Sequence, residues 1–134
     1  MELGGTCLIG SLSYERRLAH DWPLRVAVGA FPAYSILGSS TSVILWPAVT
    51  MGRLFGSGDY HFELALGVVA WAELGRGQPG LFATGTIGYR YQAPGGGIVF
   101  RVGATPLIKV RDPEGSHISP TFKPWAGISV GTAW

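Results

Sequence analysis

The sequence predicts an all-β fold, an antiparallel up-and-down transmembrane β-barrel that forms a single domain over residues 1–134. Three observations lead to this prediction. Hydrophobic residues make up 47% of the chain and charged residues only 13%, well below the roughly 25% of soluble domains. Gly, Arg, Pro or Ser interrupts every apolar run before it reaches the length of a membrane helix. The apolar residues lie instead in short alternating segments bounded by turn-forming residues.

Seven such segments are predicted as strands. Most of them supply the roughly 9–11 residues that a tilted strand needs to cross a bilayer. Pro47 and Pro106 fall inside two segments and predict a local strand end, edge or bulge, because proline cannot donate to the ladder. The segments are residues 8–18, 24–34, 42–55, 60–72, 81–92, 98–108 and 121–134.

The connections alternate between two kinds. Residues 19–23, 56–59 and 93–97 are tight and rich in turn residues, whereas 35–41, 73–80 and 109–120 are longer and more polar. Outer-membrane barrels have short periplasmic turns, long outer loops and even strand numbers. We therefore expect eight strands, the first truncated: residues 1–4 supply only its end, 4–6 form a tight outer turn, and the rest lies upstream with any signal peptide.

Each segment carries a large apolar face and an opposite face of small residues with sparse charges. Phe62 and Leu64, for example, alternate with Glu63 and Ala65. A soluble eight-stranded barrel should show large apolar residues inside and abundant charge outside. The inverted pattern predicts lipid around the barrel and a narrow polar lumen, in the outer membrane of a Gram-negative bacterial cell.

A cluster of charged residues is predicted inside the lumen at the periplasmic end. Each member lies a few residues from a tight turn and has the lumenal parity. A charge in so narrow a lumen needs partners or water, and the planar guanidinium of arginine suits that role. We interpret the cluster as a salt-bridge plug; a gate or an anion site is the alternative, favoured by the excess of Arg over Glu. The members are Glu15, Arg25, Arg53, Glu63, Arg90 and Arg101.

Aromatic residues near the strand ends predict the two girdles that flank the apolar band of such barrels. The alternative is the ordinary aromatic enrichment of strands. The periplasmic girdle comprises Tyr14, Phe62, Tyr89, Tyr91, Phe100 and Trp134, and the outer one Trp46 and Trp71.

Other functions receive little support from the sequence. A net charge of +2 without a Lys/Arg-rich run argues against nucleic acid, and Cys7, the one cysteine, can form neither an internal disulfide nor a metal cluster. No metal, cofactor or catalytic residue is predicted. A lipid-modifying enzyme remains an alternative because His117 follows Ser116 and precedes Ser119 and Thr121 in an outer loop, with Asp112 and Glu114 as possible orienting acids.

Four stretches resemble a family of uncharacterised small outer-membrane β-barrel proteins of Bacteroidetes-type bacteria. The resemblance implies the same fold and location, a first strand that leads into the Glu2–Gly5 segment, and a terminal aromatic residue, here Trp134 where Phe is more usual, read by the barrel-assembly machinery. It implies no activity. The matching residues are 2–5 with 11–16, 88–92 with 95–96, 100–103 with 105–107, and 124–131.

The sequence thus predicts a monomeric, integral outer-membrane barrel with a plugged lumen and a structural or interaction role, in contact with outer-membrane lipid. A small pore or transport barrel, and a soluble barrel that binds an apolar ligand, are the further alternatives. The composition does not indicate a substrate.

Overall fold

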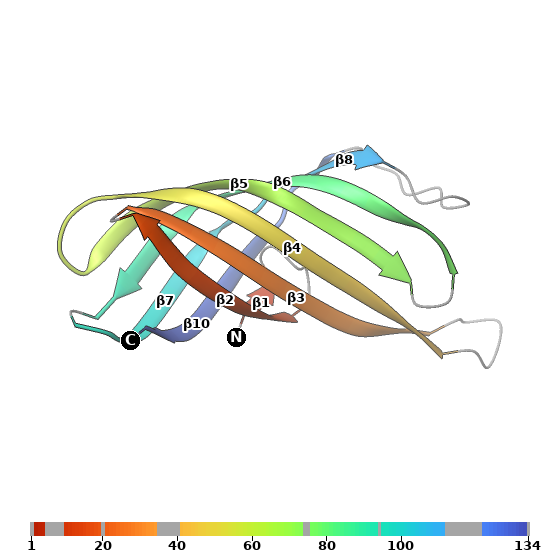
Figure 1. Ribbon diagram of the computed structural model, residues 1–134, viewed down its shortest axis with the longest axis horizontal. Coiled ribbons are helices and arrows are strands. Elements are labelled where there is room, and N and C mark those ends of the chain that lie inside the picture. Colours follow the sequence, from red (N-terminus) through yellow and green to blue (C-terminus); the bar gives the residue numbers. More distant parts are fainter. Residues whose placement is uncertain are drawn as a thin grey trace.

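The computed structural model is all-β, and its antiparallel strands form one curled, barrel-like sheet (Figure 1). It describes residues 2–4, 10–19, 21–34, 41–73, 76–93, 95–111 and 122–133. Within these ranges no helix is long and apolar enough to span a membrane. The strands are β1 (Glu2–Gly4), β2 (Gly10–Ala19), β3 (Trp22–Tyr34), β4 (Thr41–Phe55), β5 (Tyr60–Glu73), β6 (Arg76–Gln92), β7 (Gly97–Ala104), β8 (Leu107–Arg111), β9 (Phe122–Lys123) and β10 (Ala126–Ala133).

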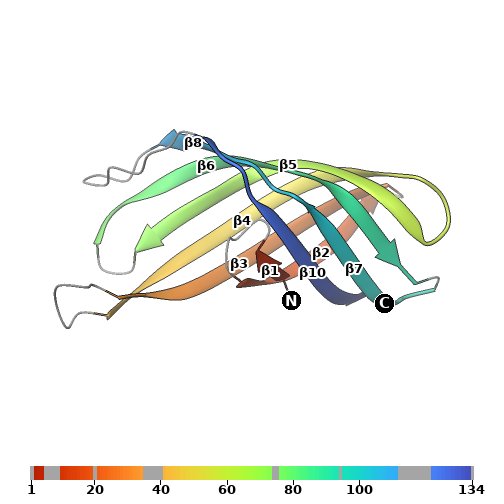
Figure 2. The ribbon, with the colours of Figure 1, turned by 180° about the vertical axis from the view of Figure 1, so that it is seen from behind.

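The strand pairings run around the curl. The order is β5-β4-β3-β2-β1-β10-β7-β6, and β6 also pairs with β5. From β2 to β7 each strand pairs with the next along the chain, as short antiparallel links allow. The short β1 lies between β2 and β10 (Figure 2). β8 pairs with β6, and β9 pairs with β8.

The predicted strands match the structure closely except at three places. Residues 73–80, predicted as a long loop, belong mostly to strands: β5 ends at Glu73, β6 begins at Arg76, and these two residues pair. Pro79 precedes Leu81, which among the described residues is the first residue of β6 that pairs with β8. Its missing N–H therefore interrupts no pairing with β8 there. The predicted strand 98–108 is divided into β7 and β8 at Pro106. The predicted strand 121–134 is likewise divided, into β9 and β10, at Pro124 and Trp125.

Proline also explains an irregularity in β4. Pro47 pairs with Val28 of β3, but the ladder to β5 skips from Leu45↔Ala72 to Ala48↔Val69. The gap falls at Trp46 and Pro47, where proline offers no backbone donor. The ladder continues in the same register on both sides, so the proline interrupts pairing without ending the strand.

The two faces of the sheet differ as the alternation predicts. On β3, Arg25 and Ala27 are buried while Val26 and Val28 are exposed. The interior of the curl has two parts. Toward the ends of the strands linked by residues 35–40 and 74–75, apolar side chains pack together, which we call the apolar layer; toward the tight-turn ends, charged side chains are buried. The apolar layer comprises Ala27, Ile44, Trp46, Ala48, Val69, Phe82 and Leu107, with Trp71 packed against it.

Candidate functional site

Five charged side chains meet inside the curl, near the tight turns; we call them the charge layer. They come from five strands, β2, β3, β5, β6 and β7, and each occupies an inward position of its strand. Glu63, Arg90 and Arg25 are only 2%, 3% and 5% exposed. The members are Glu15, Arg25, Glu63, Arg90 and Arg101.

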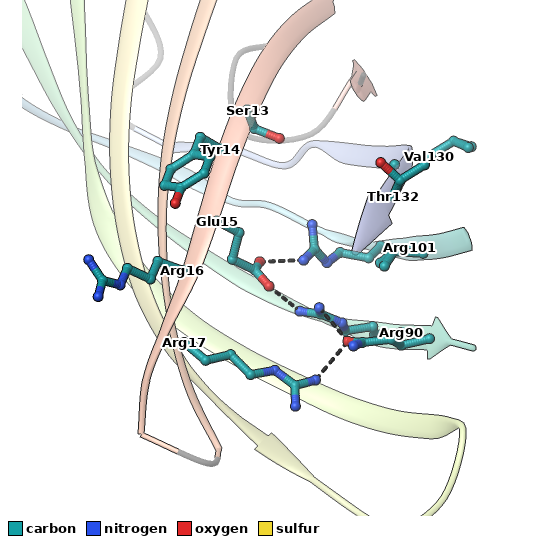
Figure 3. Close-up of a pocket in the computed structure, with 12 residues that line it drawn as sticks. Ser13, Tyr14, Glu15, Arg16, Arg17, Arg90, Arg101, Val130 and Thr132 are labelled. Carbon is teal, nitrogen blue, oxygen red and sulfur yellow. Dashed lines mark hydrogen bonds and ion pairs between the residues drawn. The ribbon is translucent and has the colours of Figure 1, made fainter. Parts of the chain in front are cut away.

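Glu15 is the centre of the charge layer because its carboxylate contacts three guanidinium groups. Arg90 Nη1 donates to Glu15 Oε1 at 2.5 Å, and Arg101 Nη2 donates to Oε2. Arg25 Nε lies 3.5 Å from the same Oε2. Since β2 is not a neighbour of β6 or β7, these bonds cross the interior from wall to wall (Figure 3).

Glu63 forms the second centre of the layer. Arg25 Nη2 donates to Glu63 Oε1 at 2.6 Å, and Arg101 Nε lies 3.2 Å from Glu63 Oε2. Each of Arg25 and Arg101 therefore bridges both carboxylates. Charge-assisted bonds of this kind are stronger than neutral ones, and they offset the cost of burying the ions only when the partners remain in place.

The charge layer also explains how two arginines can lie directly opposite each other on neighbouring strands. Arg90 and Arg101 are cross-strand partners on β6 and β7, and like charges in that position repel. The carboxylate of Glu15, reaching over from β2, binds both. Removing this carboxylate would leave the two guanidinium groups facing each other.

Glycines make room for the layer. Gly127, Gly103 and Gly88 lie in one cross-strand row over β10, β7 and β6, and the row continues to Glu63 on β5. The backbones of β6 and β7 are so close that a Cβ on Gly88 would lie 2.3 Å from the carbonyl oxygen of Val102. The large, buried side chain of Glu63 thus stands beside a part of the wall that has no side chains.

Sequence reasoning missed two polar residues that extend the layer. The side-chain oxygen of Gln92 accepts hydrogen bonds from Arg90 Nη2 and from Arg17 Nη2, both at 2.7 Å. The signal was present, because Gln92 has the parity of Arg90 on β6 and Arg17 has the parity of Glu15 on β2. Both lie nearer the tight turns than the buried ions: Gln92 is two residues after Arg90, and Arg17 is two residues after Glu15.

The prediction that Arg53 joins the lumenal cluster is wrong. On β4 the inward positions are Thr50 and Leu54, both 3% exposed, so Arg53 lies on the outer face. Its guanidinium carbon stands 5.8 Å from the ring centre of Trp22 and 5.2 Å from that of Phe55. An attraction between a cation and two aromatic faces replaces the predicted ion pairs.

The predicted outer girdle is wrong as well, because Trp46 and Trp71 face inward. Trp46 is 8% exposed and belongs to the apolar layer. Its ring centre lies 6.1 Å from that of Trp71 and 6.2 Å from that of Phe82. The indole nitrogen of Trp71 is buried without a hydrogen-bond partner among the described residues. The two rings fill the interior.

The aromatic residues predicted at the tight-turn ends do gather on the outer face. Tyr14 and Tyr89 are 62% and 66% exposed, and Phe62 meets Tyr89 edge to face at 5.6 Å between ring centres. This outward-facing aromatic group also contains Phe55 and Tyr60, which were not predicted as girdle residues. Phe55 pairs with Phe62 at 6.5 Å, and Tyr60 pairs with Tyr91 at 5.3 Å. Phe100 is 40% exposed on the same face; Trp134 lies outside the described residues.

Two openings lead toward the charge layer. One, of about 620 Å³, is lined by Glu15, Arg17, Arg90 and Arg101 together with residues of β10 (Figure 3). The other, of about 360 Å³, lies among the tight turns and shares Arg17 and Gln92 with the first. The surroundings of the ions are therefore polar and open at the rim.

The arrangement offers ion pairing and no evident covalent chemistry. No group of three or more His, Cys, Asp or Glu in the described ranges could hold a metal ion. The residues of the enzyme alternative, Asp112, Glu114, Ser116, His117, Ser119 and Thr121, lie outside the described residues. Cys7 lies outside them too.

Comparisons with known proteins add no relative. No family model matches the chain, and no curated protein or solved structure is significantly similar to it.

Proposed function

We propose that this chain is an integral barrel of the bacterial outer membrane whose lumen is closed, and that it acts as a structural or interaction element of that membrane. The observation that carries the proposal is the inversion of the two faces. Leu66 is 77% exposed and its cross-strand partner Met51 is 49% exposed, whereas Glu63 on the same strand as Leu66 is 2% exposed.

Lipid is the solvent that suits this outer face. Soluble monomers seldom expose large contiguous apolar patches, yet here Val26, Val49, Leu66 and Val68 are all at least 45% exposed on adjacent strands β3, β4 and β5. Water would penalise that surface at roughly 25 cal/mol per Å². In a bilayer the same side chains face hydrocarbon, as the outward apolar residues of membrane barrels do.

An eight-stranded count is supported by register. On β6, Ile87 pairs with Ala104 of β7. Thr84, three residues earlier on β6, pairs with Leu107 of β8, which is three residues after Ala104, so β8 continues β7 in the same register. The same holds for β10 and β9: Ala126 pairs with Ala104, and Lys123 pairs with Leu107. Counting β7 with β8 and β10 with β9 as two interrupted strands gives eight, the even number typical of bacterial barrels.

The two interior layers support a closed lumen. The charge layer crosses the barrel through Glu15 and Glu63. In the apolar layer, the ring centres of Trp71 and Phe82 lie 6.1 Å and 6.2 Å from that of Trp46. Eight strands enclose just enough space for side chains to fill. A salt-bridge plug at one end and packed aromatic rings at the other leave no continuous water path.

Two measurements test the proposal. The protein should remain in the outer-membrane fraction after washing with alkaline carbonate and leave it only with detergent; extraction without detergent would contradict the membrane assignment. Purified protein in planar bilayers should show no steady conductance across 100 mV. A reproducible open pore would contradict the closed lumen and favour a transport barrel.

A further inference from the structure

The larger opening beside the charge layer, the cavity of about 620 Å³, has lining residues from both faces of the sheet; we call it the side cavity. Glu15 and Arg101 border it with inward side chains, whereas Tyr14 and Val130 border it from the outer face, where both are exposed. Through Arg17 it also adjoins the smaller opening among the tight turns. A ligand can therefore reach the side cavity from the outer face or from the tight-turn rim.

The side cavity has a cationic lining. Among the described residues, four guanidinium groups border it and one carboxylate, that of Glu15. Arg90 and Arg101 already share this carboxylate, so it does not balance the others. A buried charge without a counter-charge is costly, and an anion in the side cavity would reduce that cost. The guanidinium groups are those of Arg16, Arg17, Arg90 and Arg101.

Donors that the charge layer does not use lie around the same space. The side-chain oxygen of Gln92 accepts hydrogen bonds from Arg17 and Arg90, which leaves its amide nitrogen to donate elsewhere. Among the described residues, Arg17 makes that bond through Nη2 alone, so its Nε and Nη1 remain for another acceptor. Ser13 adds a hydroxyl from the face of β2 that carries Glu15 and Arg17, and Figure 3 shows these three side chains in order along the strand. A guanidinium, an amide and a hydroxyl thus border one polar space.

The side cavity has room for a ligand beside these donors. Gly131 of β10 lines it, and a Cβ added there would meet no heavy atom within 4 Å. Its volume falls in the range of roughly 300–1,000 Å³ that is typical of small-molecule pockets. A phosphate monoester carries a charge of about −1.5 to −2 and three acceptor oxygens, and guanidinium groups bind such oxygens in pairs. Phosphate therefore matches the charge and the several donors of the lining better than a carboxylate or a halide does.

We propose that the side cavity is a binding site for a phosphate group, held by Arg17, Gln92 and Ser13 in the positive field of the charge layer. Two sources supply this chemistry: a dissolved phosphate that enters at the rim, and a phospholipid headgroup that enters from the outer face, with its acyl chains along Tyr14 and Val130. The site goes beyond the proposed function, which assigns the barrel no ligand, and the first source does not depend on a membrane.

Isothermal titration calorimetry of the full chain in nonionic detergent, at neutral pH and constant ionic strength, tests the site. The probes are inorganic phosphate and dihexanoyl phosphatidic acid. Dihexanoyl phosphatidylcholine, which has the same acyl chains but no net charge, is the lipid control. We expect saturable binding of one or both phosphate probes and much weaker binding of phosphatidylcholine. Binding of inorganic phosphate would identify a dissolved ligand, and binding of phosphatidic acid alone would identify a lipid headgroup.

Three variants separate the site from a general attraction of anions. Arg17→Gln should weaken binding about tenfold, since a hydrogen bond between charged groups is lost. Arg53→Gln removes the same charge near the tight turns, but from a residue that lines neither cavity, and should change affinity by less than about twofold because distant surface charges are screened. Gly131→Leu removes no charge and fills the space, so it should weaken binding at least as much as Arg17→Gln.

Absence of saturable binding of either phosphate probe would overturn the proposal, as would equal weakening by Arg17→Gln and Arg53→Gln. An affinity for phosphatidylcholine equal to that for phosphatidic acid, with no binding of inorganic phosphate, would overturn it too, because apolar contact would then explain the binding. Melting curves without ligand show whether each variant is folded; should Gly131→Leu fail to fold, the two arginine variants still decide. Carbonate extraction and conductance, measured without a phosphate probe, test the proposed function separately.

Discussion

Replacing Glu63 by Gln should destabilise the protein more than any surface change of charge. The substitution preserves shape but removes one of two carboxylates from a layer of three arginines. Arg25, which donates to Glu63 at 2.6 Å and is 5% exposed, would lose its nearest counter-charge. Breaking a buried ion pair by removing one partner costs about 3–5 kcal/mol. Glu63 is 2% exposed, so solvent does little to reduce that figure.

The assay is reversible denaturant unfolding in detergent or lipid vesicles, followed by tryptophan fluorescence. Arg16→Gln, at an exposed outward position of β2, serves as the control and should change stability by less than about 0.5 kcal/mol. The double variant Glu63→Gln/Arg25→Gln should lose less than the sum of the single variants, since the uncompensated cation is gone. An unchanged unfolding midpoint for Glu63→Gln, or strict additivity in the double variant, would refute the paired role of the layer.

Three further predictions follow from other parts of the fold. Gly88→Ala should lower stability by about 1–3 kcal/mol because its Cβ would meet the backbone of β7, whereas Gly131→Ala, with open space around it, should be tolerated in the same unfolding assay. Leu66→Arg should destabilise the protein in vesicles by about 2–4 kcal/mol; a neutral effect there would indicate that this face meets water. Trp46 and Trp71, examined singly with the other tryptophans replaced by phenylalanine, should resist quenching by brominated lipid chains, since both point inward, and strong quenching would place them back on the outer face.

The alternation of apolar and polar residues predicts the inward positions correctly where one face of a strand is plainly polar. On β5, Glu63 and Ala65 between Leu64 and Leu66 define the phase, and the buried positions follow it. On β4 the run Val43–Val49 is apolar on both faces, so the alternation does not indicate which of its residues point inward. Only the register Ala27↔Ala48 with β3 determines which residues point inward. That single ambiguity accounts for the errors at Arg53 and at Trp46.

The partners inside the charge layer could not be predicted for a different reason. Glu15 and Arg90 are 75 residues apart and lie on strands that do not pair. Their meeting depends on how far the strands are staggered around the curl, which no local pattern records. Trp71 has the parity of Glu63, so its phase indicates the interior, although its position near a strand end is that of a girdle residue.

The uneven interior has a consequence for the direction of insertion. The five ions of the charge layer lie near the tight turns, while Trp46, Val69 and Phe82 fill the other end. A barrel that enters a bilayer with the apolar end leading does not carry the charge layer through the midplane. The ions can stay on the side of entry and never shed their water together. We therefore expect one orientation to be kinetically preferred, with the tight turns left on the side from which the protein arrives.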